Sequence, residues 1–173
     1  CAQAPLLFIG SPTPKRSGAL ANTLTIGRRL RLFALLDFKQ GNKQLNATDL
    51  LRCTSALGAG LCEANYRPEN YSPVYLAETV GNALSQGIVH QWVENTSFAK
   101  LREVSAAYTL PDGWIPGASQ ASFSLAAREL ITWTKYNGID PEVSSAGAGG
   151  VTAQDQALYP PLSRIIATLS IRF

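Results

Sequence analysis

The chain has 173 residues, of which 46% are apolar and 16% are charged, and this composition excludes wholesale disorder. The net charge of +3 comes without any run of basic residues, which gives nucleic-acid binding little support. No stretch approaches the roughly 18 consecutive apolar residues of a membrane-spanning helix. Because the sequence does not begin with Met, we expect a processed product or a fragment of a longer chain.

Two segments near the start alternate between apolar and other side chains, which is the period-two pattern of a β-strand. Residues 18–27 carry the weaker pattern, because Asn22 shares a face with Leu20, Leu24 and Ile26. Residues 29–39 carry the stronger one, with an apolar face made of Leu30, Leu32, Ala34, Leu36 and Phe38. The segment Gly27-Arg28-Arg29 is short enough to join the two strands tightly.

A long connection, about residues 40–96, is expected to contain some helix. Asn46 or Thr48 can cap a helix over residues 47–56. Ser72-Pro73 is a good start for a second helix over residues 74–86, with Pro at its first position.

Aromatic and cysteine residues of this connection are candidates for binding and for a disulfide. The rings are Tyr66, Tyr71, Tyr75 and Trp92, which either stack on a substrate or dock a partner, or pack loop against loop. Cys53 and Cys62 are spaced to close a small disulfide loop, which suits an oxidising exterior. Two unpaired thiols fit the sequence equally well.

Two further strands follow, at residues 102–110 and 121–133. In the first, Val104, Ala106, Tyr108 and Leu110 alternate with other residues. In the second, Glu129 interrupts the apolar face and predicts a bulge or the end of the buried band. The seven residues 111–117 between them, PDGWIPG, are typical of a turn.

A second long connection, about residues 135–162, leads to the last strand. Five apolar residues share one face of that strand, and the other face is polar except for Ile166. The apolar set is Ile165, Ala167, Leu169, Ile171 and Phe173. An aromatic residue in the last outward position suggests that this end of the strand is held in place rather than frayed.

Together these segments predict an all-β fold. The five strands of roughly 9–13 residues exceed the soluble average of about 5–6 and match the roughly 9–11 of membrane-spanning strands. Short turns also alternate strictly with long connections, as in an outer-membrane barrel. We therefore expect antiparallel strands of a partial transmembrane β-barrel, with short periplasmic turns and long extracellular loops.

The sequence offers no catalytic or metal-binding constellation. His90 is the only histidine, so neither a zinc site nor a hydrolytic triad has enough residues. Asp140 and Glu142 are a weak signal for calcium. We expect no enzyme activity, no cofactor and no metal.

Three stretches make the chain similar to a known family. They are residues 94–111 (ENTSFAKLREVSAAYTLP), residues 130–143 (LITWTKYNGIDPEV) with the terminal strand, and residues 10–48. In this order they resemble the C-terminal end of SusC/RagA-type TonB-dependent outer-membrane receptors. Family members commonly have Asn at the position of Glu129, and an aromatic residue at the position of Arg16 and within residues 44–46. These departures leave the substrate class open.

The resemblance implies that residues 1–173 are the C-terminal part of a barrel of about 22 strands in the bacterial outer membrane, without a plug domain. Such receptors take up large nutrients, such as an oligosaccharide or a peptide. The implied partners are outer-membrane lipid, the rest of the barrel and its plug, a SusD-type surface lipoprotein and the barrel-assembly machinery. TonB would be contacted only through N-terminal regions that are missing here.

The resemblance also assigns roles to individual residues. The terminal apolar set from Ile165 to Phe173 would be the signal for barrel assembly. Tyr108 would lie at the periplasmic interface of the membrane, and Trp133 and Tyr136 at the outer one. The alternative is a soluble β-sheet module, binding carbohydrate or another protein, whose core contains these rings.

Overall fold

The computed structural model describes residues 7–54, 61–79, 89–145, 153–156 and 158–173. The chain forms two compact units. We call the first the sheet unit, which comprises residues 16–39, 98–134 and 161–173. We call the second the loop unit, which comprises residues 1–15, 40–97 and 135–160. Within the described residues, no helix has the length and apolar character needed to span a membrane.

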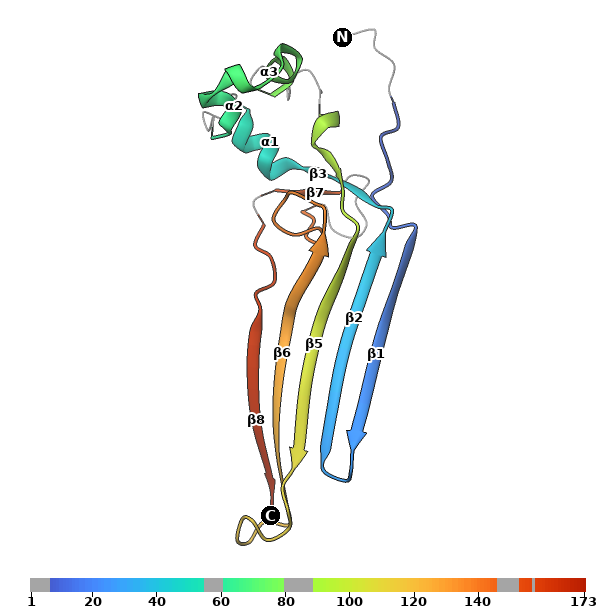
Figure 1. The fold of residues 1–173 in the computed structure, drawn as a ribbon, viewed down its shortest axis with the longest axis vertical. Coiled ribbons are helices and arrows are strands. Elements are labelled where there is room, and N and C mark those ends of the chain that lie inside the picture. The colour runs from blue at the N-terminus through green and yellow to red at the C-terminus, as the bar shows by residue number, and fades with distance from the viewer. Residues whose placement is uncertain (1–6, 55–60, 80–88, 146–152, 157) are drawn as a thin grey trace. The chain divides into compact units, whose positions relative to one another are not determined.

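The sheet unit is one five-stranded sheet in which neighbours in the chain are neighbours in space (Figure 1). The strands are β1 (Arg16–Ile26), β2 (Leu30–Gln40), β5 (Phe98–Thr109), β6 (Gln120–Thr134) and β8 (Arg164–Arg172), in the order β1-β2-β5-β6-β8. The pairs β2–β5, β5–β6 and β6–β8 are antiparallel, and the strands are 9 to 15 residues long. The predicted all-β class and its five long strands are confirmed.

Both short turns adopt backbone conformations that favour glycine. Gly27 has a φ of 62° between β1 and β2, and Gly113 and Gly117 have φ values of 80° and 82° between β5 and β6. Gln120 pairs in register with Arg172, so the C-terminus lies at the same end of the sheet as the β5–β6 turn (Figure 1).

The predicted irregularity at Glu129 is a bulge. Leu101 pairs with Ile131 while Glu103 pairs with Arg128, so β6 carries an extra residue there. Glu129 has a φ of 51°, which is unusual for a residue with a side chain. A second register shift, between Leu35 and Leu36 of β2, lies beside the same point of β5 and has no sequence signal.

The loop unit contains a second, small sheet that the sequence did not reveal. Three short strands pair in the order β4-β3-β7, with β3 antiparallel to β4 and parallel to β7. They are β3 (Lys43–Asn46), β4 (Val93–Asn95) and β7 (Gln154–Asp155). Leu45 pairs with both Val93 and Gln154, so this small sheet joins the two long connections.

The helices of the loop unit are α1 (Ala47–Cys53), α2 (Glu63–Tyr66) and α3 (Pro73–Thr79), with 3₁₀ turns η2 (Pro68–Asn70) and η3 (His90–Trp92). Two of these helices, α1 and α3, begin where the sequence predicted, and α2 had no sequence prediction. Asn46, rather than Thr48, caps α1: its Oδ1 accepts the Asp49 N–H at 3.1 Å. The predicted continuation of α3 over residues 80–86 lies outside the described residues.

A small core holds this unit together. Leu50, Cys53 and Trp92 are buried against one another, and Cys62 packs on them. Cys53 and Cys62 form a disulfide with their Cα atoms 4.8 Å apart, within the usual range.

Candidate functional site

The register of the sheet unit aligns the apolar faces of its strands into one surface. Every second row across β2, β5, β6 and β8 joins residues that the sequence pattern placed on apolar faces. Three successive rows are Leu30–Tyr108–Phe123–Leu169, Leu32–Ala106–Leu125–Ala167 and Ala34–Val104–Ala127–Ile165. We call this surface the apolar face.

The apolar face is exposed. The exposed fractions of Ile165 and Leu169 are 75% and 59%, and those of Phe123 and Leu125 are 44% and 45%. Side chains of this kind normally form a core, and an exposed contiguous surface of them indicates an apolar partner or a lipid environment.

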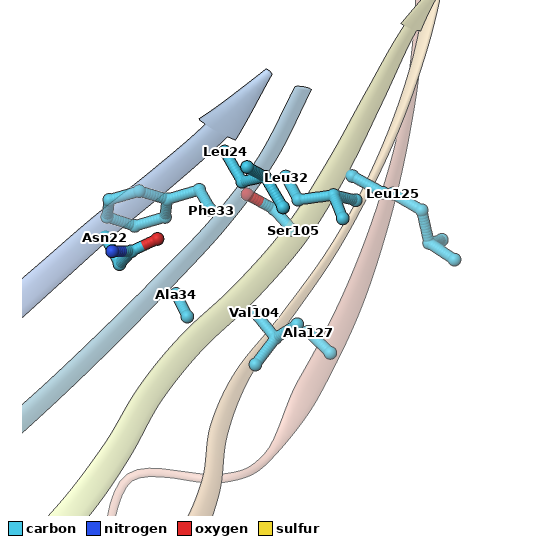
Figure 2. Close-up of a pocket in the computed structure, with 10 residues that line it drawn as sticks. Asn22, Leu24, Leu32, Phe33, Ala34, Val104, Ser105, Leu125 and Ala127 are labelled. Carbon is cyan, nitrogen blue, oxygen red and sulfur yellow. The ribbon is translucent and has the colours of Figure 1, made fainter. Parts of the chain in front are cut away.

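A shallow hollow of about 470 Å³ interrupts the apolar face, across β1, β2, β5 and β6. Figure 2 shows its lining, in which the small residues Ala34 and Ala127 leave space between larger neighbours such as Leu32 and Leu125. Polar groups are few, and Asn22 of β1 provides one of them.

The opposite face carries the charges. Residues that alternate with the apolar rows include eight charged side chains with a cross-strand partner in register. They are Arg31, Asp37, Lys39, Lys100, Glu103, Arg128, Arg164 and Arg172. We call this surface the polar face.

Arg102, at the bulge, links three strands across the polar face. Its Nε and Nη2 each donate to an oxygen of Asp37 at 3.0 Å, and its Nη1 donates to Glu129 Oε2 at 3.1 Å. Arg128 Nε donates to Glu103 Oε2 at 2.8 Å beside this group. The Arg102, Asp37 and Glu129 side chains are only 18%, 22% and 24% exposed, so these charged hydrogen bonds are partly shielded from water.

Two of the predicted interface aromatics lie on the apolar face, at its two ends. Tyr108 pairs in register with Leu30 and Phe123, and Trp133 pairs with Ala99. Their exposed fractions are 39% and 50%, and that of Phe173 is 84%. These positions fit the predicted interface, and their contact with a membrane remains a prediction.

The structure contradicts the third interface aromatic, Tyr136. Its side chain is 6% exposed in the loop unit, and its hydroxyl donates to Asp155 Oδ2 at 2.5 Å. Burial, and then this hydrogen bond, raise the pKa of Tyr136 well above its usual range. The ring packs against the backbone of Gly138, where a Cβ atom would have no room. Tyr136 therefore stabilises a fold rather than meeting an interface.

The four aromatic residues of the first long connection that were candidates for binding lie in three different environments. Trp92 is 8% exposed in the small core, so its assignment to a substrate or partner surface is wrong. Tyr71 stacks on Tyr75 with 5.0 Å between ring centroids, and its hydroxyl donates to Glu63, which matches the loop-against-loop alternative. Tyr66 is 69% exposed and available to a partner.

Sequence reasoning missed the polar residues that connect the two long connections. Glu94 Oε2 accepts from the Asn137 backbone N–H and from Asn137 Nδ2, each at 3.0 Å, and Asp155 accepts from the Thr48 backbone N–H as well as from Tyr136. No local pattern marks these residues, because their partners are distant in sequence. Among the described residues, no group of three or more His, Cys, Asp or Glu could hold a metal ion.

Comparison with solved structures shows which fold this is. The RagAB peptide importer in its closed-closed state matches with a TM-score of 0.68 and 23% identity, over 94% of this chain and 18% of that chain. The same importer in its open-open state matches with a TM-score of 0.68 and 23% identity, over 95% and 18%. A structure of the RagAB peptide transporter matches with a TM-score of 0.60 and 24% identity, over 82% and 16%. No protein-family model and no curated protein matches the chain.

The chain thus has the fold of a part of the RagAB importer, and it spans less than a fifth of that protein's length. Because the likeness extends over 94–95% of this chain, it includes both the long strands and the connections between them.

Proposed function

We propose that the chain forms five consecutive strands in the wall of a SusC/RagA-type TonB-dependent receptor in the bacterial outer membrane. One observation carries the proposal: a single sheet exposes a contiguous apolar face and carries charged, ion-paired side chains on the opposite face. The apolar face contacts lipid, and the polar face lines the interior of the barrel.

The strand lengths suit this role. β2 has 11 residues, about 36 Å at about 3.3 Å per residue, so even at a tilt of about 45° it crosses the apolar band of about 25 Å that outer-membrane barrels present. The weaker alternation of β1 and its Asn22 remain compatible with a lipid-facing strand, since Leu20, Leu24 and Ile26 occupy the rest of that face.

The two outer strands of the sheet need further partner strands in a membrane. β1 and β8 each have one partner strand in the described sheet. In hydrocarbon, an unpaired edge leaves backbone N–H and C=O groups without hydrogen bonds, at a cost of several kcal/mol per group. Further strands of the same polypeptide therefore flank β1 and β8 in the proposed barrel.

Within the receptor, the chain contributes structure and not chemistry. We infer uptake of a large nutrient such as an oligosaccharide or a peptide, with no enzymatic step. A SusD-type lipoprotein covers the outer mouth, and the barrel-assembly machinery recognises the terminal apolar set from Ile165 to Phe173. The plug and the contact with TonB belong to other parts of the polypeptide. Support comes from the likeness of this fold to part of a peptide importer.

Membrane fractionation of the full-length polypeptide that carries these residues tests the proposal. We expect it in the outer-membrane fraction, resistant to alkaline carbonate, and soluble only in detergent. Recovery of a monomer without detergent would instead favour the soluble carbohydrate-binding or interaction module.

A further inference from the structure

We propose that the apolar face carries a site for one anionic phospholipid, with its phosphate at Arg28 and Arg29 and one acyl chain in the hollow. The inference rests on the proposed function, because it places the hollow in lipid. It adds a specific ligand to a surface that would otherwise contact bulk membrane.

The first observation is the charge of the β1–β2 turn. Arg28 and Arg29 form the tip of this turn with Gly27, and both are exposed. Neither side chain has an ion-pair partner within the part of the chain that the structure describes. Two adjacent guanidinium groups offer planar, charged donors that suit phosphate oxygens.

The second observation is the hollow itself. It is lined almost entirely by apolar side chains from four strands (Figure 2). A gap of this kind on a flat lipid-facing wall gains stability when an alkyl chain fills it, because unfilled space forfeits dispersion contacts. Ala106, in register with Leu32 and Leu125, lies within it.

The third observation is the separation of the two features. The hollow begins three residues after Arg29, at Leu32, and includes Ala34 two residues further on. At about 3.3 Å per residue, these positions lie roughly 10 and 17 Å along the strand from the arginines, which is roughly 7 and 12 Å of membrane depth for a strand tilted by about 45°. One leaflet of hydrocarbon is about 15 Å deep, half of the roughly 30 Å core. An acyl chain whose phosphate is bound at the turn therefore reaches the hollow within its own leaflet.

The positive charge at this end of the sheet favours an anionic lipid over a zwitterionic one. The two short turns of this end, residues 27–29 and 110–119, contain the two arginines and a single acid, Asp112. A phosphatidylglycerol headgroup brings a net negative charge to this end, whereas phosphatidylethanolamine brings none. Trp114, 70% exposed in the β5–β6 turn, supplies an aromatic ring of the kind found at membrane interfaces.

Native mass spectrometry of the full-length receptor in detergent, titrated with phosphatidylglycerol or phosphatidylethanolamine, tests the site. We expect one phosphatidylglycerol to bind with at least about tenfold higher affinity. The double variant R28Q/R29Q should lose this preference, and Ala106→Phe, which fills the hollow, should lower affinity for the same lipid. The matched control is R31Q/R172Q, which removes two charges from the polar face at the same end and should keep the preference.

Other results overturn the inference. Equal affinity for the two lipids contradicts it, as does an equal loss of preference in R31Q/R172Q. A receptor dimer that displaces lipid, and that Ala106→Phe dissociates, would assign the hollow to a second copy instead. Carbonate extraction of the same variants separates the two proposals: a receptor that stays in the membrane without lipid preference contradicts only the lipid site, whereas a soluble polypeptide contradicts the proposed function as well.

Discussion

Leu169 and Thr168 are neighbours on β8 whose side chains alternate onto opposite faces. Leu169 pairs with Phe123 on the apolar face, and Thr168 pairs with Ser124 on the polar face. In the proposed barrel, we expect Leu169→Arg to cause a destabilisation of about 2–4 kcal/mol, because the substitution would place a charge in lipid near mid-membrane. Thr168→Arg should be tolerated far better. The fraction of folded receptor in the membrane measures both, and equal tolerance would show that the faces are assigned wrongly.

Arg102 neutralises two carboxylates that are shielded from water. Arg102→Met leaves Asp37 and Glu129 without their shared partner, and we expect a loss of about 1–3 kcal/mol in the free energy of unfolding. The control, Arg128→Met, removes a single ion pair from a more exposed arginine and should cost less. Denaturant unfolding of the receptor in detergent compares them. A larger loss in the control would contradict the central role of Arg102.

At the scale of elements, alternation along the chain predicted the five long strands because each has two different environments. Glu129 likewise predicted the bulge, because a charged residue on the apolar face conflicts with a regular strand. The strands β3, β4 and β7 were not predicted, because two to four residues are too few to show the alternation of apolar and polar side chains that marks a strand. Tyr136 and Trp92 were misplaced because an aromatic ring suits an interface and a core equally, and only distant partners decide between them.

The Tyr136–Asp155 hydrogen bond joins two parts of the last long connection and gives the loop unit a pH dependence. The pKa of Tyr136 is raised above its unfolded value of about 10, so its stabilisation is complete below pH 10 and is lost as pH rises further. Tyr136→Phe should destabilise the loop unit at neutral pH by about 1 kcal/mol and weaken its alkaline transition. Hydrogen exchange of residues 153–156 at neutral and alkaline pH measures this. An unchanged alkaline transition in the variant would contradict it.

The Cys53–Cys62 disulfide closes a short loop between α1 and α2, with nine residues of sequence separation. Chain-entropy arguments for a loop of this size predict a loss of roughly 2–3 kcal/mol when it is removed. C53S/C62S should therefore be cleaved faster by protease within the loop unit, and a reductant should have the same effect on the native protein. Reductant must leave the double variant unchanged. Equal cleavage of native and variant protein would mean that the bond contributes no stability.

At the scale of the whole molecule, the sheet unit has an apolar face and two outer strands with one partner each. In water, an exposed apolar face and unpaired strand edges promote aggregation. In the wall of a membrane barrel, the apolar face contacts lipid and the edges pair with further strands. We therefore expect the isolated chain to aggregate when it is expressed without detergent. The fold likeness, which covers 18% of the RagAB importer chain, is consistent with a segment that is completed by other strands.

The most direct test of lipid contact is electron paramagnetic resonance on the full-length receptor in lipid vesicles, with a nitroxide at each position from 165 to 171. We predict high accessibility to oxygen at Ile165, Ala167, Leu169 and Ile171, alternating with low accessibility at Ile166, Thr168 and Ser170. Accessibility that does not alternate, or that alternates in the opposite phase, would contradict the account.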